Sequence, residues 1–174
     1  MPRFTSPILL VLALAACTAD TPMAAPARVP NAVQSRSTAG LPIAGHCETT
    51  PLGPPVVTFP ILRQEDTGGC EVTHLGRTVL HASRVVNLLT GAQVAEIIFT
   101  AAAGDVLRMR SVGTSTPAGP ILRFTGTNTI VGGTGRFANA KGQLKATGVV
   151  DLATANASID YAGVISFDAS DHEH

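Results

Sequence analysis

The residues best placed for nucleotide chemistry lie in a glycine-rich stretch, but their context predicts a structural turn. Residues 133–138, Gly-Thr-Gly-Arg-Phe-Ala, fit the G-x-G-x-x-A dinucleotide fingerprint, while the stretch lacks the Lys-Ser/Thr pair of a P-loop. The fingerprint must open a helix on a parallel sheet, whereas here the next segment alternates as a strand. We expect glycines with positive φ or close backbone approach, with Phe137 and Ala140 closing one end of the fold. The residues assigned to this structural loop are Gly132, Gly133, Gly135, Phe137 and Gly142.

Charged residues inside the strand-like segments could form a working site if their side chains pointed inward. The alternation leaves Arg84 and Glu96 ambiguous. Facing inward they would form a buried pair with perturbed pKa values, and facing outward they would be ordinary surface charges. We expect both to face outward. Three arginines oppose apolar neighbours in the alternation and are expected to face solvent: Arg108, Arg110 and Arg123. If Arg84, Glu96 and Asp160 all faced solvent, the barrel interior would lack the ionisable groups that an enzymatic site needs, which would argue against an enzyme.

Histidines and serines give little support for catalysis or metal binding. His74 lies beside Gly76, which favours a structural position at a strand end over a catalytic one. Residues 171–174, Asp-His-Glu-His, could chelate a metal weakly, but residues 169–174 are more typical of a disordered tail. No G-x-S-x-G motif marks a serine hydrolase. We expect no metal and no cofactor.

The first sixteen residues are typical of a bacterial lipoprotein signal peptide. Residues 8–15 form an unbroken apolar run, far shorter than the roughly 20 residues that cross a bilayer. Residues 14–17, Leu-Ala-Ala-Cys, resemble the lipobox, which implies cleavage before Cys17 and its lipidation. An ordinary signal peptide cut nearby is the alternative. Thr18 replaces the aspartate that favours inner-membrane retention, which implies export and lipid anchoring at the outer membrane or cell surface.

Length, composition and charge limit what can follow this leader. Residues 17–40 are rich in Pro, Ala, Ser and Thr without apolar periodicity, which predicts a flexible tether. The remainder of the 174-residue chain suffices for one domain. Twelve Lys and Arg balance twelve Asp and Glu, and the chain has one Tyr and no Trp. It therefore lacks both the basic surface and the aromatic platform of a nucleic-acid-binding protein.

Cys47 and Cys70 are the two cysteines outside the leader. In an oxidising compartment such an even pair favours a disulfide, and the Pro-rich segment between them could not fix itself in a sheet. Two buried free thiols are the alternative. A metal site is less expected because neither cysteine has a second Cys or His at ligand spacing.

Residues 41–168 are predicted to form an all-β domain. Residues 143–152 and 158–167 alternate small or apolar residues with polar ones, as strands with one buried face do. Four more segments are candidate strands: 78–89, 92–100, 105–113 and 120–131. Short Gly- or Asn-containing connections suit tight hairpins, and residues 85–90 resemble residues 149–154, which suggests two equivalent hairpins. About eight such strands predict an eight-stranded antiparallel up-and-down barrel, with a sandwich as the other way to protect the edges.

Residues 132–142 resemble the G-G-T-G-x-F-x-x-A-x-G signature of plant dirigent proteins, which share their fold with allene oxide cyclases. Residues 73–77, 87–91 and 125–127 are similar to segments of bacterial secreted proteins with the same pattern. The resemblance covers about residues 68–167. It implies an eight-stranded barrel with a central hydrophobic cavity, and it leaves a homo-oligomer open because the plant proteins are often oligomeric. No catalytic residue of the plant enzymes carries over.

The expected ligand pocket is the barrel interior. The alternation places these residues there: Met109, Phe124, Leu144, Tyr161 and Ile165. Small residues at Gly126, Ala146, Gly148 and Gly163 would leave room, and the Tyr161 phenol would be the polar handle. A solid core is the alternative. We expect a lipid-anchored barrel that binds a small hydrophobic molecule. A non-catalytic envelope interaction module is the second hypothesis, and a cyclase or isomerase by fold analogy is the third.

Overall fold

A computed structural model describes residues 40–167, which contain nine strands and one short 3-10 helix. In chain order these are β1 (Leu41–Pro51), β2 (Val56–Thr58), β3 (Ile61–Val72), β4 (Gly76–Asn87), β5 (Ala92–Ala101), β6 (Val106–Ala118), β7 (Ile121–Gly133), η1 (Gly135–Phe137), β8 (Lys141–Asp151) and β9 (Ala157–Ser166). The predicted signal peptide, Cys17, nearly all of the predicted tether and the predicted tail lie outside the described residues. Among residues 40–167, no helix has the length and apolar character that crossing a membrane requires.

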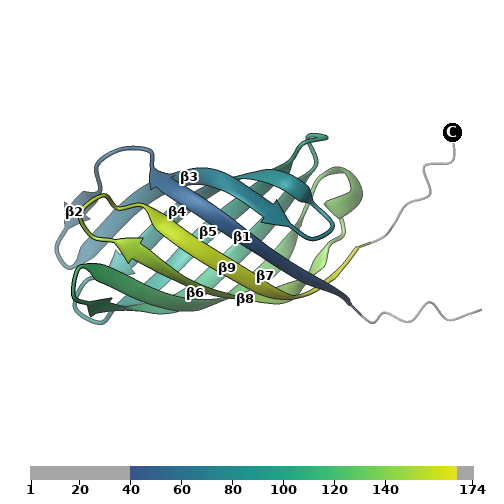
Figure 1. The fold of residues 1–174 in the computed structure, drawn as a ribbon. Coiled ribbons are helices and arrows are strands. Elements are labelled where there is room, and N and C mark those ends of the chain that lie inside the picture. Colours follow the sequence, from purple (N-terminus) through teal and green to yellow (C-terminus); the bar gives the residue numbers. More distant parts are fainter. Residues whose placement is uncertain (1–39, 168–174) are drawn as a thin grey trace, which may run out of the picture. The chain divides into compact units, whose positions relative to one another are not determined.

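Eight of the strands close into an antiparallel barrel (Figure 1). The sheet runs in the order β1-β9-β8-β7-β6-β5-β4-β3, and β1 then pairs with β3 to complete the ring. The short strand β2 pairs with the start of β3 as a ninth strand. This confirms the predicted eight-stranded barrel and excludes the sandwich. Closure pairs the two edges that an open meander would leave exposed.

Strand boundaries differ from the predicted ones by a few residues, and the end of β4 shows why. The pattern predicts a strand over residues 78–89, but β4 ends at Asn87. The Asn87 side-chain carbonyl accepts hydrogen bonds from the backbone N–H groups of Leu89 (2.9 Å) and Thr90 (3.2 Å), which starts the turn early. Asp151 accepts the equivalent pair of bonds after β8. The two hairpins with related sequences therefore have equivalent turns.

The two ends of the barrel are built from different connections. The closed end holds the β3–β4 turn, the β5–β6 turn and η1, and the open end holds β2 and the turns that follow β4, β6 and β8. Leu41 of β1 pairs with Ile165 of β9, so the described chain enters and leaves the barrel at its closed end (Figure 1). The closed half and the open half of the interior are named here after these ends.

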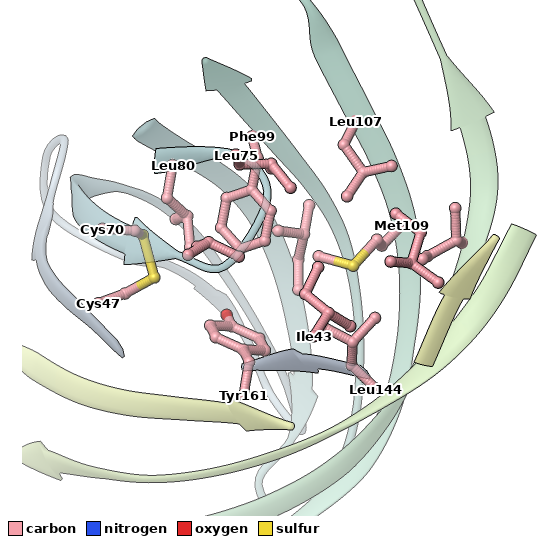
Figure 2. Packing of buried hydrophobic residues seen from close by; sticks show 14 of the residues in the cluster. Ile43, Cys47, Cys70, Leu75, Leu80, Phe99, Leu107, Met109, Leu144 and Tyr161 are labelled. Atoms are coloured by element: carbon pink, nitrogen blue, oxygen red, sulfur yellow. A yellow bond between two sulfur atoms is a disulfide. The ribbon is translucent and has the colours of Figure 1, made fainter. Parts of the chain in front are cut away.

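Large apolar side chains fill the closed half (Figure 2). Phe99, Leu107, Phe137 and Ile165 are all 0% exposed. The Phe137 ring packs edge-on against Phe167, with centroids 5.4 Å apart. Full burial of one such side chain stabilises the fold by about 1.5–3 kcal/mol, so this half carries much of the hydrophobic stability.

The glycine-rich segment forms the turn that places Phe137 at the closed end. Gly135 has a φ of 55°, and a Cβ at that position would collide with the Asp105 carboxylate. Arg136 pairs with Asp105 at 3.4 Å, and its guanidinium lies 4.8 Å from the centroid of the Phe137 ring. The segment continues as a 3-10 turn into a strand, so it offers no long helix whose N-terminus could bind a phosphate.

A disulfide joins the two strands that close the ring. Cys47 on β1 and Cys70 on β3 are direct register partners, and their sulfur atoms are bonded. The two side chains are 0% and 3% exposed and point into the interior (Figure 2). The predicted disulfide is thus confirmed, and it cross-links β1 to the rest of the meander.

Candidate ligand-binding site

Two hollows occupy the open half of the barrel, and Arg84 lines both. The inner cavity, near the middle of the barrel, has a volume of about 60 Å³. The mouth pocket, at the open end, has a volume of about 570 Å³. The polar residues of the inner cavity are Thr49, Asp66, Arg84, Gln93, Ser111, Asn128 and Tyr161.

The inner cavity exists because inward positions at this level carry small side chains. Five alanine or glycine residues line it: Ala82, Ala95, Gly126, Ala146 and Ala157. Gly126 and Ala146 are among the small residues that the sequence predicts to leave room. Gly148 and Gly163 do not line the cavity, because the Phe124 ring and the backbone at Gln143 lie where their Cβ atoms would be. Small residues therefore create space only where no neighbour fills it.

Arg84 and Asp66 form an ion pair inside the barrel, which corrects the expectation that Arg84 faces outward. The Arg84 Nη2 atom lies 3.1 Å from Asp66 Oδ2, and the two side chains are only 17% and 10% exposed. Glu96 does face solvent, where it lies 3.9 Å from Arg110 with its side chain 74% exposed. The parity of β4 allowed either face for Arg84, and the carboxylate of Asp66 offsets the cost of turning the guanidinium inward.

Burial dominates the ionisation of this region. Burial raises the pKa of Asp66 above its ordinary value, although the positive charge and hydrogen bond of Arg84 act in the opposite direction. Burial, with a smaller contribution from the Asp66 charge, also raises the pKa of the Tyr161 phenol. Tyr161 is 3% exposed and packs edge-on against Phe99, with centroids 5.5 Å apart. The phenol therefore remains protonated at neutral pH.

Several polar atoms at the inner cavity have no hydrogen-bond partner among residues 40–167. They are both amide atoms of Asn128, the Oε1 atom of Gln93 and the Nε atom of Arg84. Asn128 is 0% exposed. Native proteins pair at least roughly 90% of such buried groups, so the four atoms leave the wall of this small cavity able to donate and accept further hydrogen bonds.

The mouth pocket has mainly apolar walls. Its aliphatic lining consists of Leu62, Val86, Leu88, Leu89, Leu122, Val150 and Leu152. Leu89 and Leu152 belong to the two equivalent turns and are 68% and 54% exposed at the rim. The Gln64 amide donates hydrogen bonds to the carbonyls of Gly53 (3.0 Å) and Glu65 (2.8 Å), which fixes the loop between β1 and β2 beside the pocket.

The five residues predicted to line a ligand pocket lie at two different levels of the barrel. Phe124 and Tyr161 line the inner cavity. Met109, Leu144 and Ile165 are at most 1% exposed within the packed core and line neither hollow. Figure 2 shows Met109 and Leu144 among the other core side chains. Alternation gives the face of each residue but not its level along the barrel axis, so these three assignments to the pocket are corrected.

No family model, curated protein or solved structure matches this chain.

The polar residues on the outer wall of the barrel can be compared with the requirements of a metal site. Within residues 40–167, no group of three or more His, Cys, Asp or Glu side chains is arranged to hold a metal ion. On the outer wall, hydrogen bonds with Asp160 (2.8 Å) and Glu48 (2.9 Å) raise the pKa of His46. His74, with a φ of 67°, lies in the β3–β4 turn and donates through Nε2 to the Pro42 carbonyl at 3.0 Å, which is a structural position.

Proposed function

We propose that this protein is a small-molecule binding barrel whose ligand enters at the open end. The observation that carries the proposal is the mouth pocket of about 570 Å³, bounded mainly by aliphatic side chains. Ligand sites in proteins typically have volumes of roughly 300–1,000 Å³, mostly apolar walls and a few polar groups. The mouth pocket fits that description, and the filled closed half gives the barrel a floor.

The proposal places the barrel outside the cytoplasm on a lipid anchor. The lipobox-like residues 14–17 support lipidation of Cys17, and the Cys47–Cys70 disulfide suits an oxidising compartment. The resemblance to dirigent proteins and allene oxide cyclases agrees with an eight-stranded barrel that holds an apolar ligand. Replacing Cys17 by Ala should release the chain from the membrane fraction, and unchanged membrane retention would contradict the anchor.

Binding in the mouth pocket can be measured with the apolar fluorophore N-phenyl-1-naphthylamine and the purified full chain. Leu122 lines the pocket, so Leu122→Arg should weaken probe binding by about tenfold or more, since it places a charge on an apolar wall. Val112 is a matched control because it is 66% exposed on β6 and lines neither hollow. Val112→Arg should leave probe binding unchanged.

The comparison of the two arginine variants separates the pocket from other apolar parts of the chain. Any probe bound elsewhere is bound equally by the two variants. Equal probe binding by Leu122→Arg, Val112→Arg and the wild type would contradict the proposed mouth pocket.

The inward ion pair favours one second candidate function, a cyclase- or isomerase-type enzyme. Such chemistry needs an ionisable group at the ligand, and Asp66 with its raised pKa is placed at the inner cavity. Compounds that copurify with the chain can be extracted and followed by mass spectrometry. Conversion of such a compound to an isomer that is lost in Asp66→Asn would support the enzyme, and a compound retained unchanged would support binding alone.

A further inference from the structure

We propose that the inner cavity binds the polar end of the ligand, and that this end is an uncharged group that both donates and accepts hydrogen bonds, such as a primary carboxamide. The inference rests on the proposed function, since it assigns the ligand's apolar body to the mouth pocket. It adds a direction of binding, polar end first, and a chemical class for that end.

The distribution of unpartnered atoms points to the inner cavity as a polar site. Six buried side-chain atoms of residues 40–167 lack a hydrogen-bond partner, and four of them belong to residues that line this cavity. Asn128 is 0% exposed, and both its amide oxygen and its amide nitrogen are unpartnered. A buried asparagine side chain is costly unless something pairs with its amide group.

The size of the cavity limits what can enter. A volume of about 60 Å³ accepts a group of a few heavy atoms and not a whole ligand. Arg84 is the one lining residue that the two hollows share, so it marks the boundary that the polar end of the ligand would have to pass. The apolar body and the polar end thus occupy different hollows.

The charges at the cavity favour an uncharged group. Asp66 and Arg84 are the only charged residues in its lining, and they already pair with each other at 3.1 Å. A ligand anion would add a second negative charge near Asp66, and a cation would meet the guanidinium of Arg84. Neither charge would be compensated without breaking the existing pair.

The unpartnered atoms offer both kinds of hydrogen bond. Asn128 Oδ1 and Gln93 Oε1 accept, whereas Asn128 Nδ2 and Arg84 Nε donate. A carboxamide carries one carbonyl acceptor and two N–H donors in a compact planar group. It is therefore complementary to the Asn128 side chain in the same way that one amide pairs with another.

Three ligands with the same alkyl chain test the inference by calorimetry on the full chain. Octanamide presents donors and an acceptor, nonan-2-one replaces the amide NH2 by a methyl group, and octanoate is charged. We expect octanamide to bind about tenfold tighter than either of the others, because the ketone lacks the donors and the carboxylate is repelled. N-phenyl-1-naphthylamine reports separately on the mouth pocket.

Variants of the cavity locate the effect. Asn128→Leu should remove the preference for octanamide over nonan-2-one and leave binding of the fluorescent probe unchanged. Gln93→Met, which removes one acceptor at similar volume, should reduce the same preference and provides a second measurement if Asn128→Leu folds poorly. Val112→Arg on the outer wall should keep the full preference.

The outcomes separate this inference from the function on which it depends. If the probe binds in the mouth pocket but octanamide binds no tighter than nonan-2-one, the inner cavity holds water only and the inference is wrong, while the proposed function stands. An octanamide preference that survives both cavity variants would also overturn it. If the wild-type chain binds neither the probe nor any of the three ligands, the proposed function itself fails.

Discussion

The closed and open halves of the barrel interior come from the same strands in the same alternation, yet one is filled and the other is hollow. On β7, Ile130 packs in the closed half, and Asn128, two residues away on the same face, lines the inner cavity. On β6, Met109 packs in the closed half, and Ser111, two residues away on the same face, lines the inner cavity. The backbone is continuous across this boundary, so side-chain size and polarity alone decide where the core ends.

This difference separates two tasks along the barrel axis. Large aliphatic and aromatic side chains in the closed half bury apolar surface and provide stability. Small and polar side chains at the inner cavity give up part of that stability and leave room for a ligand. Variants that exchange or remove features of one half should therefore affect stability and binding unequally.

The largest expected effect comes from removing the side chain that fills the closed end. Phe137→Ala should lower the free energy of unfolding by about 3–5 kcal/mol, because Phe137 is 0% exposed and leaves a cavity behind. Phe124→Ala should cost clearly less, since Phe124 already borders the inner cavity. Urea unfolding measures both, and equal losses would remove the proposed distinction between the halves.

Removing the disulfide should have the next largest effect, and it should fall on stability alone. Cys47 and Cys70 are separated by 23 residues, for which the loss of chain entropy on cross-linking contributes about 3 kcal/mol. Replacing both by Ala should lower the free energy of unfolding by about that amount. The variant should still bind N-phenyl-1-naphthylamine in the mouth pocket, because neither cysteine lines the mouth pocket or the inner cavity. Loss of probe binding in the folded variant would show that the ring closure also shapes the mouth.

Two reverse exchanges, polar to apolar at the inner cavity and apolar to polar in the closed half, should change the free energy of unfolding in opposite directions. Asn128→Leu should raise the free energy of unfolding by about 1 kcal/mol, since it replaces two unpartnered buried atoms by apolar surface. The matched reverse change, Leu144→Asn, should destabilise the closed half, where Leu144 is 1% exposed. If Asn128→Leu is strongly destabilising, Asn128 has a structural role that the cavity does not explain.

The smallest expected effect is a pH dependence specific to the open half. Because the folded pKa of Asp66 is raised, the native state keeps this proton at a pH where the unfolded chain has lost it. Stability contributed by Asp66 therefore falls as pH rises through its native pKa. The free energy of unfolding of the wild type minus that of Asp66→Asn should decrease as the pH rises above 3.8, the ordinary pKa of this carboxyl group. A difference that increases with pH would mean that attraction to Arg84 outweighs burial.

The meander was predictable from local signals, and the pairing of Cys47 with Cys70 was predictable because they are the two cysteines outside the leader. Period-two alternation and turn residues mark most strands, and hairpin connectivity then leaves few closed topologies. β1 and β3 were harder to recognise. β3 places polar residues on its inward face, where Gln64 and Asp66 stand in line with Cys70 and Val72, so the usual apolar stripe is incomplete.

The composition of the site could not be predicted from alternation, because two kinds of information are missing from it. The level of a residue along the axis depends on the register of every hairpin, which is why Met109 and Leu144 were assigned to a pocket that begins two residues further along. The inward orientation of the Arg84 side chain depends on its ion pair with Asp66 on the neighbouring strand β3. The short β3–β4 turn sets a register in which Asp66 lies opposite Ala82, two residues from Arg84 on the same face. Working out this register from the turn was the signal that could have revealed the ion pair.

The entry and exit of the described chain at the closed end has a practical consequence. Leu41 and Ile165 lie side by side there, on the side of the barrel opposite the aliphatic rim. A sensor chip, resin or fluorescent protein joined directly at either end of the described residues, at Gly40 or Phe167, would therefore be attached on the far side from the entrance. Ligand screens on immobilised material can use either orientation, whereas insertions at the turns after β4 or β8 would alter the entrance itself.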